Sequence, residues 1–205
     1  MNMRPALQAC RSLLFAIRSI RLLPHLLLWH LSPRRDLITL DILRWSEAFL
    51  RLPENHADAR TFFVLMIRFK EYRSLFYLRL GAAAGLVRFL CPPMESLLLF
   101  CEDIGPGLII QHGHGAVIVA ERIGAYCWIN QQVTLGTGPR PGSPILGDHV
   151  RIAPGAKVLG HIRIGDRSIV GANAVVTKDV PPDVTVVGVP AYIMRRDGVR
   201  VREEL

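Results

Sequence analysis

Residues 145–180 read ILGDHVRIAPGAKVLGHIRIGDRSIVGANAVVTKDV, and an aliphatic residue recurs there at every sixth position. The recurring residues are Leu146, Ile152, Val158, Ile164, Val170 and Val176. A helix would place apolar residues three and four apart and a single strand would alternate in twos, so neither element explains a period of six. The period is typical of a solenoid whose coils stack aliphatic side chains and turn at small residues. We therefore predict a parallel β-helix.

The repeat extends upstream and is interrupted twice. Its earlier positions are Ile104, Ile110, Ile123, Ile129 and Leu135. We place the next in-phase residue after Ile110 at Val117, which leaves one extra residue in the corner Gln111–Gly115. A second insertion forms a loop, roughly Thr137–Ser143. Insertions must loop out of a solenoid, and such loops are commonly functional. Because successive coils lie about 5 Å apart, we expect this corner and this loop to line one cleft.

Three regions are predicted along the chain. Residues 1–100 form an α-helical region with helices over Asp36–Trp45 and Thr61–Leu80, where aliphatic and aromatic residues lie three and four apart. Residues 101–190 form the β-helix domain, and residues 191–205 form a basic C-terminal tail. The predicted fold class is mainly β with α, with the helical region preceding the β-helix.

Composition narrows the range of partners. The chain has 205 residues and a formal net charge of +8, which favours anionic partners such as a phosphate-bearing cofactor. Nucleic acid is not an expected partner, because no basic and aromatic recognition motif is present. No metal is expected either, since the repeat places no carboxylate or thiolate beside His112 and His114. The four cysteines form no CxxC pair, which indicates reduced thiols in a cytoplasmic protein.

Residues 12–31 are apolar but interrupted by Arg18, Arg21 and Pro24. The longest clean run, Leu22–Leu31, is about half of the roughly 20 residues that a bilayer-spanning helix needs. Neither a secretory signal nor a transmembrane helix is predicted. Two interpretations stay open: a helix that packs inside the protein or between subunits, and a basic interfacial helix that places the protein at the inner face of the membrane as a peripheral contact.

The motifs of the repeat region resemble those of the hexapeptide-repeat acyltransferases. The resemblance rests on His112, the Thr137–Gly138 loop, the ending Val170–Pro182 and the segment Val187–Ala191. Within the family, Gln111–His112 and Val133–Gly136 look most like the serine acetyltransferase branch. The segment Glu71–Arg79 is similar to the helical arms of acetyltransferases from capsule and exopolysaccharide biosynthesis.

This resemblance implies a left-handed coil, a homotrimer, and acetyl-CoA as co-substrate in a groove between coils of two subunits. Backbone amides at the glycine turn Gly136, Thr137 and Gly138 are expected to donate to the thioester or the pantetheine arm. The likeness places Ala153, Gly171 and Ala172 along the pantetheine arm. Thr177, Lys178 and the basic residues Arg195 and Arg196 would meet the adenosine phosphates, where cations are expected.

The departures from the family concern the acceptor. The serine acetyltransferase branch has an Asp-His pair where this chain has Gln111–His112, and an aspartate one coil earlier, where this chain has Leu97. Its extruded loop ends in Arg-His-Pro, whereas this chain has Gly142–Ser143–Pro144. Losing a charge-assisted contact costs on the order of 1.5–3 kcal/mol. We therefore expect an altered acceptor pocket, with Gln111, His114 and Ser143 as its candidate residues.

His112 is the expected general base. An alcohol attacks a thioester poorly unless its proton is removed, and a histidine is largely neutral at cytoplasmic pH and can accept it. A third group normally orients such a histidine, and Glu121 is the best carboxylate available in the sequence. His114 is expected to line the acceptor site or to be merely exposed.

Three functions follow from these observations. The first is transfer of acetyl from acetyl-CoA to a hydroxyl of a sugar or glycan precursor in surface polysaccharide synthesis. The alternative is serine O-acetylation in cysteine synthesis, favoured by overall likeness and opposed by the missing acceptor residues. A non-catalytic solenoid or a carbonic-anhydrase-like protein is a third class, and the latter needs zinc-binding histidines at a spacing that the repeat does not provide.

Overall fold

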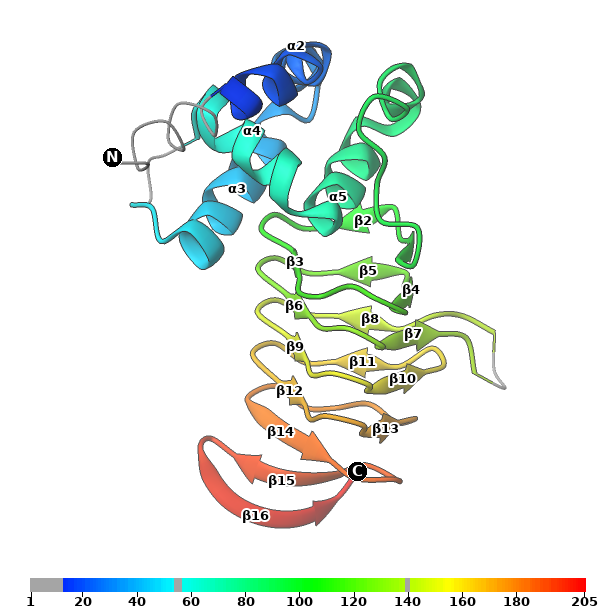
Figure 1. Cartoon of the computed structure of the whole chain (residues 1–205). Coiled ribbons are helices and arrows are strands. Elements are labelled where there is room, and N and C mark those ends of the chain that lie inside the picture. Colours follow the sequence, from blue (N-terminus) through cyan, green and yellow to red (C-terminus); the bar gives the residue numbers. More distant parts are fainter. Residues whose placement is uncertain (1–12, 54–56, 139–140) are drawn as a thin grey trace, which may run out of the picture. The chain divides into compact units, whose positions relative to one another are not determined.

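The computed structural model describes residues 13–53, 57–138 and 141–205. The chain divides into two compact units, Met1–Pro93 and Met94–Leu205, and Figure 1 shows the first as helices and the second as stacked strands. The division falls a few residues before the expected boundary at residue 100. Each unit is described by itself.

The first unit is helical, as expected. Its elements are α2 (Leu23–Leu31), α3 (Arg35–Trp45), the π-helix η1 (Ser46–Leu50), α4 (Ala59–Arg68), α5 (Lys70–Leu80) and the 3-10 helix η2 (Gly81–Leu86), and residues 13–20 are helical as well. The single helix expected over Thr61–Leu80 is wrong, because Phe69 adopts an extended backbone conformation between α4 and α5. The side chain of Asp58 accepts from the Thr61 N–H and so begins α4.

Aromatic rings and one ion pair form the interior of this unit. Trp45, Phe62, Tyr72 and Phe76 are almost fully buried. Asp41 of α3 and Arg79 of α5 are also buried, and the Arg79 Nε lies 2.8 Å from an Asp41 carboxylate oxygen. A buried charge is tolerated when it is paired in this way, so this pair ties two helices together inside the apolar core.

The segment Leu22–Leu31 has two different faces. Leu22, His25 and Trp29 are buried, whereas Leu23, Leu27 and Leu31 are exposed. None of the helices in the described part of the chain combines the length and the apolar content that crossing a bilayer requires. The buried face therefore has the packing role that one interpretation expected, while both interpretations stay open for the exposed face.

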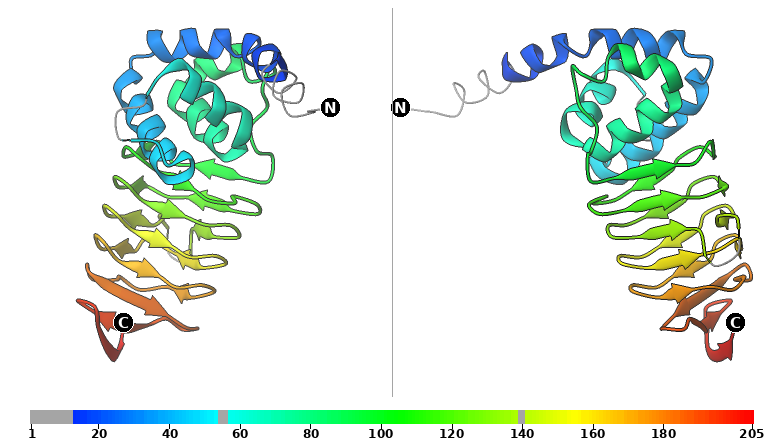
Figure 2. Two further views of the ribbon diagram at one scale, coloured as in Figure 1. Left: turned by 60° about the vertical axis from the view of Figure 1, so that its left-hand side comes forward. Right: turned by 90° about the vertical axis from the view of Figure 1, so that its right-hand side faces the viewer.

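The second unit is a parallel β-helix, as predicted. Sheet 1 has the strand order β1 (Leu98–Phe100), β4 (Val117–Val119), β7 (Thr134–Gly136), β10 (Lys157–Leu159) and β13 (Val175–Val176). Sheet 2 contains β2 (Asp103–Ile104), β5 (Arg122–Ile123), β8 (Ile145–Leu146) and β11 (Arg163–Ile164). Sheet 3 contains β3 (Ile109–Ile110), β6 (Trp128–Ile129), β9 (Arg151–Ile152), β12 (Ile169–Val170) and β14 (Val184–Val187), followed by β15 and β16. Figures 1 and 2 show these coils stacked one on another.

The six-residue repeat is the core of this unit. All eleven aliphatic positions that define it in the sequence are at most 5 % exposed. Each pairs in register with its counterpart in a neighbouring coil, for example Ile129 with Ile152 and Leu135 with Val158. The placement of Val117 in phase is wrong. Ile118 pairs with Leu135 and is fully buried, whereas Val117 pairs with the outward Thr134. The corner after β3 is therefore one residue longer than expected, and the turn after β4 is shorter.

Three corners join the three sheets in every coil. The first corner leads from sheet 3 to sheet 1 and contains His112; the second leads from sheet 1 to sheet 2 and contains the inserted loop; the third leads from sheet 2 back to sheet 3. Figure 1 shows the loop leaving the stack after β7. The expected single cleft is therefore wrong for one chain, because the His112 corner and the loop lie at opposite ends of the strands of sheet 1.

The predicted basic tail is folded. Strand β15 (Tyr192–Arg196) pairs antiparallel with β14, and β16 (Val199–Glu204) pairs antiparallel with β15, so both extend sheet 3. The Arg196 guanidinium binds the Glu203 carboxylate at 2.6 Å across this hairpin. The hairpin thus ends the stack (Figure 2).

The third corner gives a stability test. A Cβ atom built on Gly124 would lie 2.3 Å from the backbone oxygen of Gly147, so Gly124→Ala forces the coils apart and should lower the free energy of unfolding by about 1–3 kcal/mol. Gly136→Ala is the matched control, because its added methyl would meet only a Thr134 side-chain atom at 3.9 Å. Urea denaturation measures both variants, and equal stability would contradict the argument.

Candidate active site

His112 lies at the first corner in a turn that presents its side chain to solvent. Its φ of 55° is in the left-handed region, and its carbonyl accepts from the His114 N–H, while Ala116 N donates to the Gly113 carbonyl at 3.2 Å. His112 and His114 are both exposed. The extra corner residues therefore turn the chain tightly and leave the imidazole of His112 accessible to a ligand.

Gln111 is held by the coil below. Its Oε1 accepts from Trp128 Nε1 and from Asn130 Nδ2, both at 3.1 Å. With the oxygen engaged twice, the amide nitrogen is the group that Gln111 can offer to a ligand. The residue beside His112 is thus a neutral, positioned donor.

His114 is tied to the chain on both sides. Its Nδ1 lies 3.4 Å from Ser96 Oγ, and its carbonyl accepts from Gln132 N at 3.0 Å. Gly115 N donates to the Ser96 carbonyl at 3.0 Å as well. These contacts position the corner that carries His112.

Glu121 lies at the second corner and is bonded away from His112. Its Oε1 accepts from the Ser143 N–H at 3.1 Å and lies 2.9 Å from His161 Nδ1. The Ser143 amide, and then His161, hold the pKa of the Glu121 carboxyl below its ordinary value. Within the described part of one chain Glu121 thus orients His161, and a role beside His112 remains a proposal.

His161 is the site candidate that sequence reasoning missed. It lies in an uninterrupted part of the repeat, two coils beyond Glu121 at the same corner. The inserted loop passes over it, because a Cβ built on Gly142, whose φ is 106°, would lie 2.7 Å from the Cβ of His161. The available signal was positional: a histidine at the corner from which the loop emerges.

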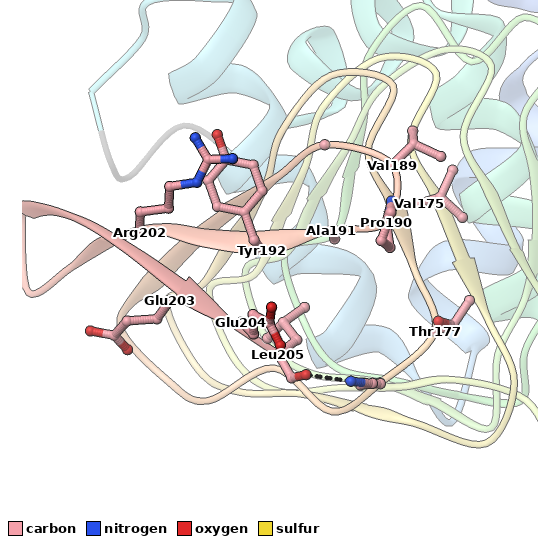
Figure 3. Close-up of a pocket in the computed structure, with 12 residues that line it drawn as sticks. Val175, Thr177, Val189, Pro190, Ala191, Tyr192, Arg202, Glu203, Glu204 and Leu205 are labelled. Carbon is pink, nitrogen blue, oxygen red and sulfur yellow. Dashed lines mark hydrogen bonds between the residues drawn. The ribbon is translucent and has the colours of Figure 1, made fainter.

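The residues expected to bind the cofactor fall in several places. Thr177 and Lys178 line a pocket of about 610 Å³ together with Gly188–Tyr192, the β16 residues Arg202–Glu204 and the adjoining Leu205, as Figure 3 shows. Lys178 Nζ donates to the Leu205 carbonyl at 2.6 Å, and the Arg202 guanidinium lies 5.1 Å from the centre of the Tyr192 ring. The lining combines the cations Lys178 and Arg202 and the Tyr192 ring with the carboxylates of Glu203 and Glu204. The two cations are the groups suited to phosphate, and the ring is suited to a stacked base.

The other expected cofactor residues do not join this pocket. Gly136, Thr137 and Gly138 run from β7 into the second corner, while Ala153, Gly171 and Ala172 lie at the first corner. Arg195 lies beside Arg167, Asp183 and Thr185 in a separate depression on sheet 3. A single phosphate site containing Lys178 and Arg195 of one chain is therefore wrong, because the antiparallel hairpin carries Arg195 away from Lys178.

Metal binding and base chemistry place different requirements on the side chains of the described residues. Residues 13–53, 57–138 and 141–205 contain no group of three histidine, cysteine, aspartate or glutamate side chains that could hold a metal ion. They do present an exposed imidazole at the first corner and a carboxylate-bound imidazole at the second. Either ring can accept a proton from a hydroxyl.

Comparisons with known proteins agree with this arrangement. Residues 143–178 match the family described as Bacterial transferase hexapeptide (six repeats). The serine acetyltransferase of Synechococcus elongatus is 50 % identical over 102 residues, which are 48 % of this chain and 42 % of the relative. That of Staphylococcus aureus is 51 % identical over 102 residues, 48 % of each protein. These matches thus span less than half the length of the relatives.

Solved structures show a similar architecture. Serine acetyltransferase from Brucella abortus strain S19 has a TM-score of 0.61 and 26 % identity and covers 79 % of this chain and 69 % of its own. Neisseria gonorrhoeae serine acetyltransferase in complex with serine has a TM-score of 0.60 and 28 % identity, covering 77 % and 67 %. The chain therefore carries a hexapeptide-repeat β-helix that is similar to those of serine acetyltransferases.

The Glu121–His161 pair gives a titration test. His161→Asn should raise the pKa of Glu121 but leave it below its ordinary value, because the Ser143 N–H remains as the larger cause. A depressed carboxyl pKa stabilises the folded state above the ordinary glutamate pKa, and that contribution is lost as the pH falls through the folded-state pKa. NMR titration of the Glu121 carboxyl carbon measures the change. An unaltered Glu121 pKa would contradict the pairing of Glu121 with His161.

Proposed function

We propose that this protein is an acetyl-CoA-dependent O-acetyltransferase with His112 as the general base and L-serine as the acceptor. The observation that carries the proposal is the exposed imidazole at the lengthened first corner between β3 and β4 of a hexapeptide-repeat β-helix. The serine acetyltransferase relatives support acetyl-CoA as co-substrate and serine as acceptor. They favour serine over a sugar as the acceptor.

The proposed reaction needs one proton to move twice. His112 accepts the proton of the acceptor hydroxyl as its oxygen attacks the thioester carbonyl. The resulting tetrahedral oxyanion is stabilised by backbone N–H groups, for which the turn Gly136–Gly138 of a second copy of this chain is the candidate. When the C–S bond breaks, the imidazolium returns the proton to the departing thiolate. The products are the O-acetyl ester and free coenzyme A. Positioned base catalysis of this kind typically contributes about 10²–10⁴-fold.

A second acceptor class has one specific observation in its favour. The residue next to His112 is the neutral Gln111, whose amide is oriented by Trp128 and Asn130. The described end of the loop, Pro141–Pro144, carries no charged side chain. A neutral donor of this kind suits a sugar hydroxyl as well as an amino acid. A single assay distinguishes the serine acceptor from a sugar acceptor.

The acceptor assay follows coenzyme A release spectroscopically. With acetyl-CoA and L-serine we expect steady turnover that saturates in both substrates, with O-acetylserine as the product by mass spectrometry. Turnover with nucleotide-activated sugars and none with serine would replace the serine proposal by the sugar candidate. No release with either acceptor would remove the transferase proposal.

The role of His112 is tested with His112→Asn. Asparagine tolerates the left-handed backbone at this position, where φ is 55°, but cannot act as a base near neutral pH. We expect kcat to fall by about a hundredfold or more while the Kd for coenzyme A stays within about twofold. His114→Asn is the neighbouring comparison and should retain most of kcat. Full activity of His112→Asn would contradict the mechanism.

The pocket of Figure 3 is the proposed site of the adenosine end of the co-substrate. Removing the ammonium group in Lys178→Met should weaken coenzyme A binding by about tenfold to a hundredfold, because a charge-assisted bond to phosphate is lost. Binding of acetyl-pantetheine, which lacks the adenosine phosphates, should not change. Calorimetry measures both, and equal losses for the two ligands would place the phosphates elsewhere.

We also propose a homotrimer, on the resemblance to the acyltransferase family. In such an assembly the first corner of one chain and the second corner of the next are available to form a shared site. Light scattering of the purified protein reports this state directly. A monomer that turns over normally would contradict it.

A further inference from the structure

We infer that His161, oriented by Glu121, binds the ammonium group of the acceptor, and that it does so in a site completed by His112 of a second copy of this chain. The inference rests on the proposed function and deepens it. It starts from a cluster at the second corner in which His161, a residue that the sequence pattern did not indicate, meets Glu121, whose carboxylate also accepts from the backbone N–H of Ser143.

The geometry of the cluster determines which ring nitrogen is available. The lowered pKa of Glu121 keeps its carboxylate ionised, and an ionised carboxylate only accepts hydrogen bonds. His161 Nδ1, at 2.9 Å, must therefore be the donor. In the neutral imidazole this leaves Nε2 with its lone pair as an acceptor. The pair thus presents an acceptor nitrogen backed by a negative charge.

This arrangement suits a cationic donor. The side chains of His161 and Glu121 are 52 % and 43 % exposed, so a ligand can reach them. The loop residue Gly142 packs directly over His161 and limits how far the ring can move. An ammonium group can donate to Nε2 and is attracted by the adjacent carboxylate. An amino acid acceptor carries such a group next to its reactive hydroxyl.

One chain cannot bring His112 and His161 to the same small acceptor. His112 precedes sheet 1 and Glu121 follows it, and strand β4 lies between them. Three residues of extended strand span about 10 Å, and the two turns add to this separation. The hydroxyl and ammonium groups of serine are only a few bonds apart. If the second corner of another copy lies against the first corner of this chain, His161 of that copy and His112 of this chain can reach the same acceptor.

The main test compares two acceptors with two substitutions. His161→Leu should raise the KM for L-serine by about tenfold to a hundredfold with little change in kcat, because an acceptor for the ammonium group is lost. His161→Gln, whose amide oxygen can accept, should lose less. Binding of 3-hydroxypropionate, which keeps the hydroxyl and carboxylate but has no ammonium group, should be the same in wild type and His161→Leu.

The comparison separates a ligand contact from support of the loop. If His161→Leu weakens serine and 3-hydroxypropionate equally, or leaves the KM for serine unchanged, the ammonium contact is overturned. His149→Asn is the control at the third corner, where His149 stacks on Tyr126, and it should match the wild type. Wild-type turnover with serine is measured first. It decides the proposed function, whereas only the ratio of variant to wild type decides the role of His161.

The second copy is tested by mixing two impaired chains, one with a low kcat and one with a high KM for serine. His112→Asn and His161→Leu chains with different tags are co-expressed, and assemblies that carry both tags are purified. In a trimer that contains both kinds of chain, one of the three shared sites always has both histidines intact. About one third of wild-type activity should therefore return. The assay uses a serine concentration below the KM of His161→Leu. Activity no higher than that of the separately purified variants, or failure of the tags to co-purify, would overturn the shared site.

Discussion

The approach of one coil to the next at the third corner is the constraint on which the solenoid depends. Gly105, Gly124, Gly147 and Gly165 each donate their backbone N–H to the following coil at 2.8–2.9 Å. A Cβ atom on any of the four would lie within 2.1–2.7 Å of an atom there. Such contacts leave no room for a side chain. The third corner has the same length in successive coils, and the insertions fall at the first and second corners. These corners flank sheet 1, and both candidate histidines lie at them.

The period of six predicted the β-helix and its buried residues because each coil repeats the same packing problem. It did not predict the register of β4, where Ile118 rather than Val117 is buried. Residue counting gives only the total length of a coil. In this coil the first corner is longer and the second corner is shorter than usual, and the two differences partly cancel in the total. Phe69 shows a similar limit in the helical unit. Its apolar side chain continues the helical pattern, and only the extended backbone reveals that α4 and α5 are separate.

The site was predictable to the extent that it disturbs the sequence pattern. His112 lies in an insertion and is visible as a break in the repeat, whereas His161 lies in the regular segment Gly160–Ile164 and disturbs nothing. Its contact with Glu121 joins residues 40 positions apart. The separation is close to the length of two coils, one of which includes the inserted loop. The contact can therefore be predicted only when the strand topology is known. The same limit applies to Arg195, which the antiparallel hairpin carries to sheet 3.

The donor and acceptor sites of the proposed enzyme depend on different parts of the chain. The nucleotide pocket is walled by the C-terminal hairpin and the last coil, whereas the acceptor contacts arise at the corners of earlier coils. A change at a corner leaves the coil stacking intact as long as the third corner keeps its glycines. Gln111, for example, is accommodated by hydrogen bonds to Trp128 and Asn130 of the next coil. His161 is a second example of a corner residue that differs without altering the stack, because the proposed acceptor site takes this histidine from a regular coil and not from the inserted loop. Acceptor chemistry can thus be rebuilt from residues that the fold itself does not constrain.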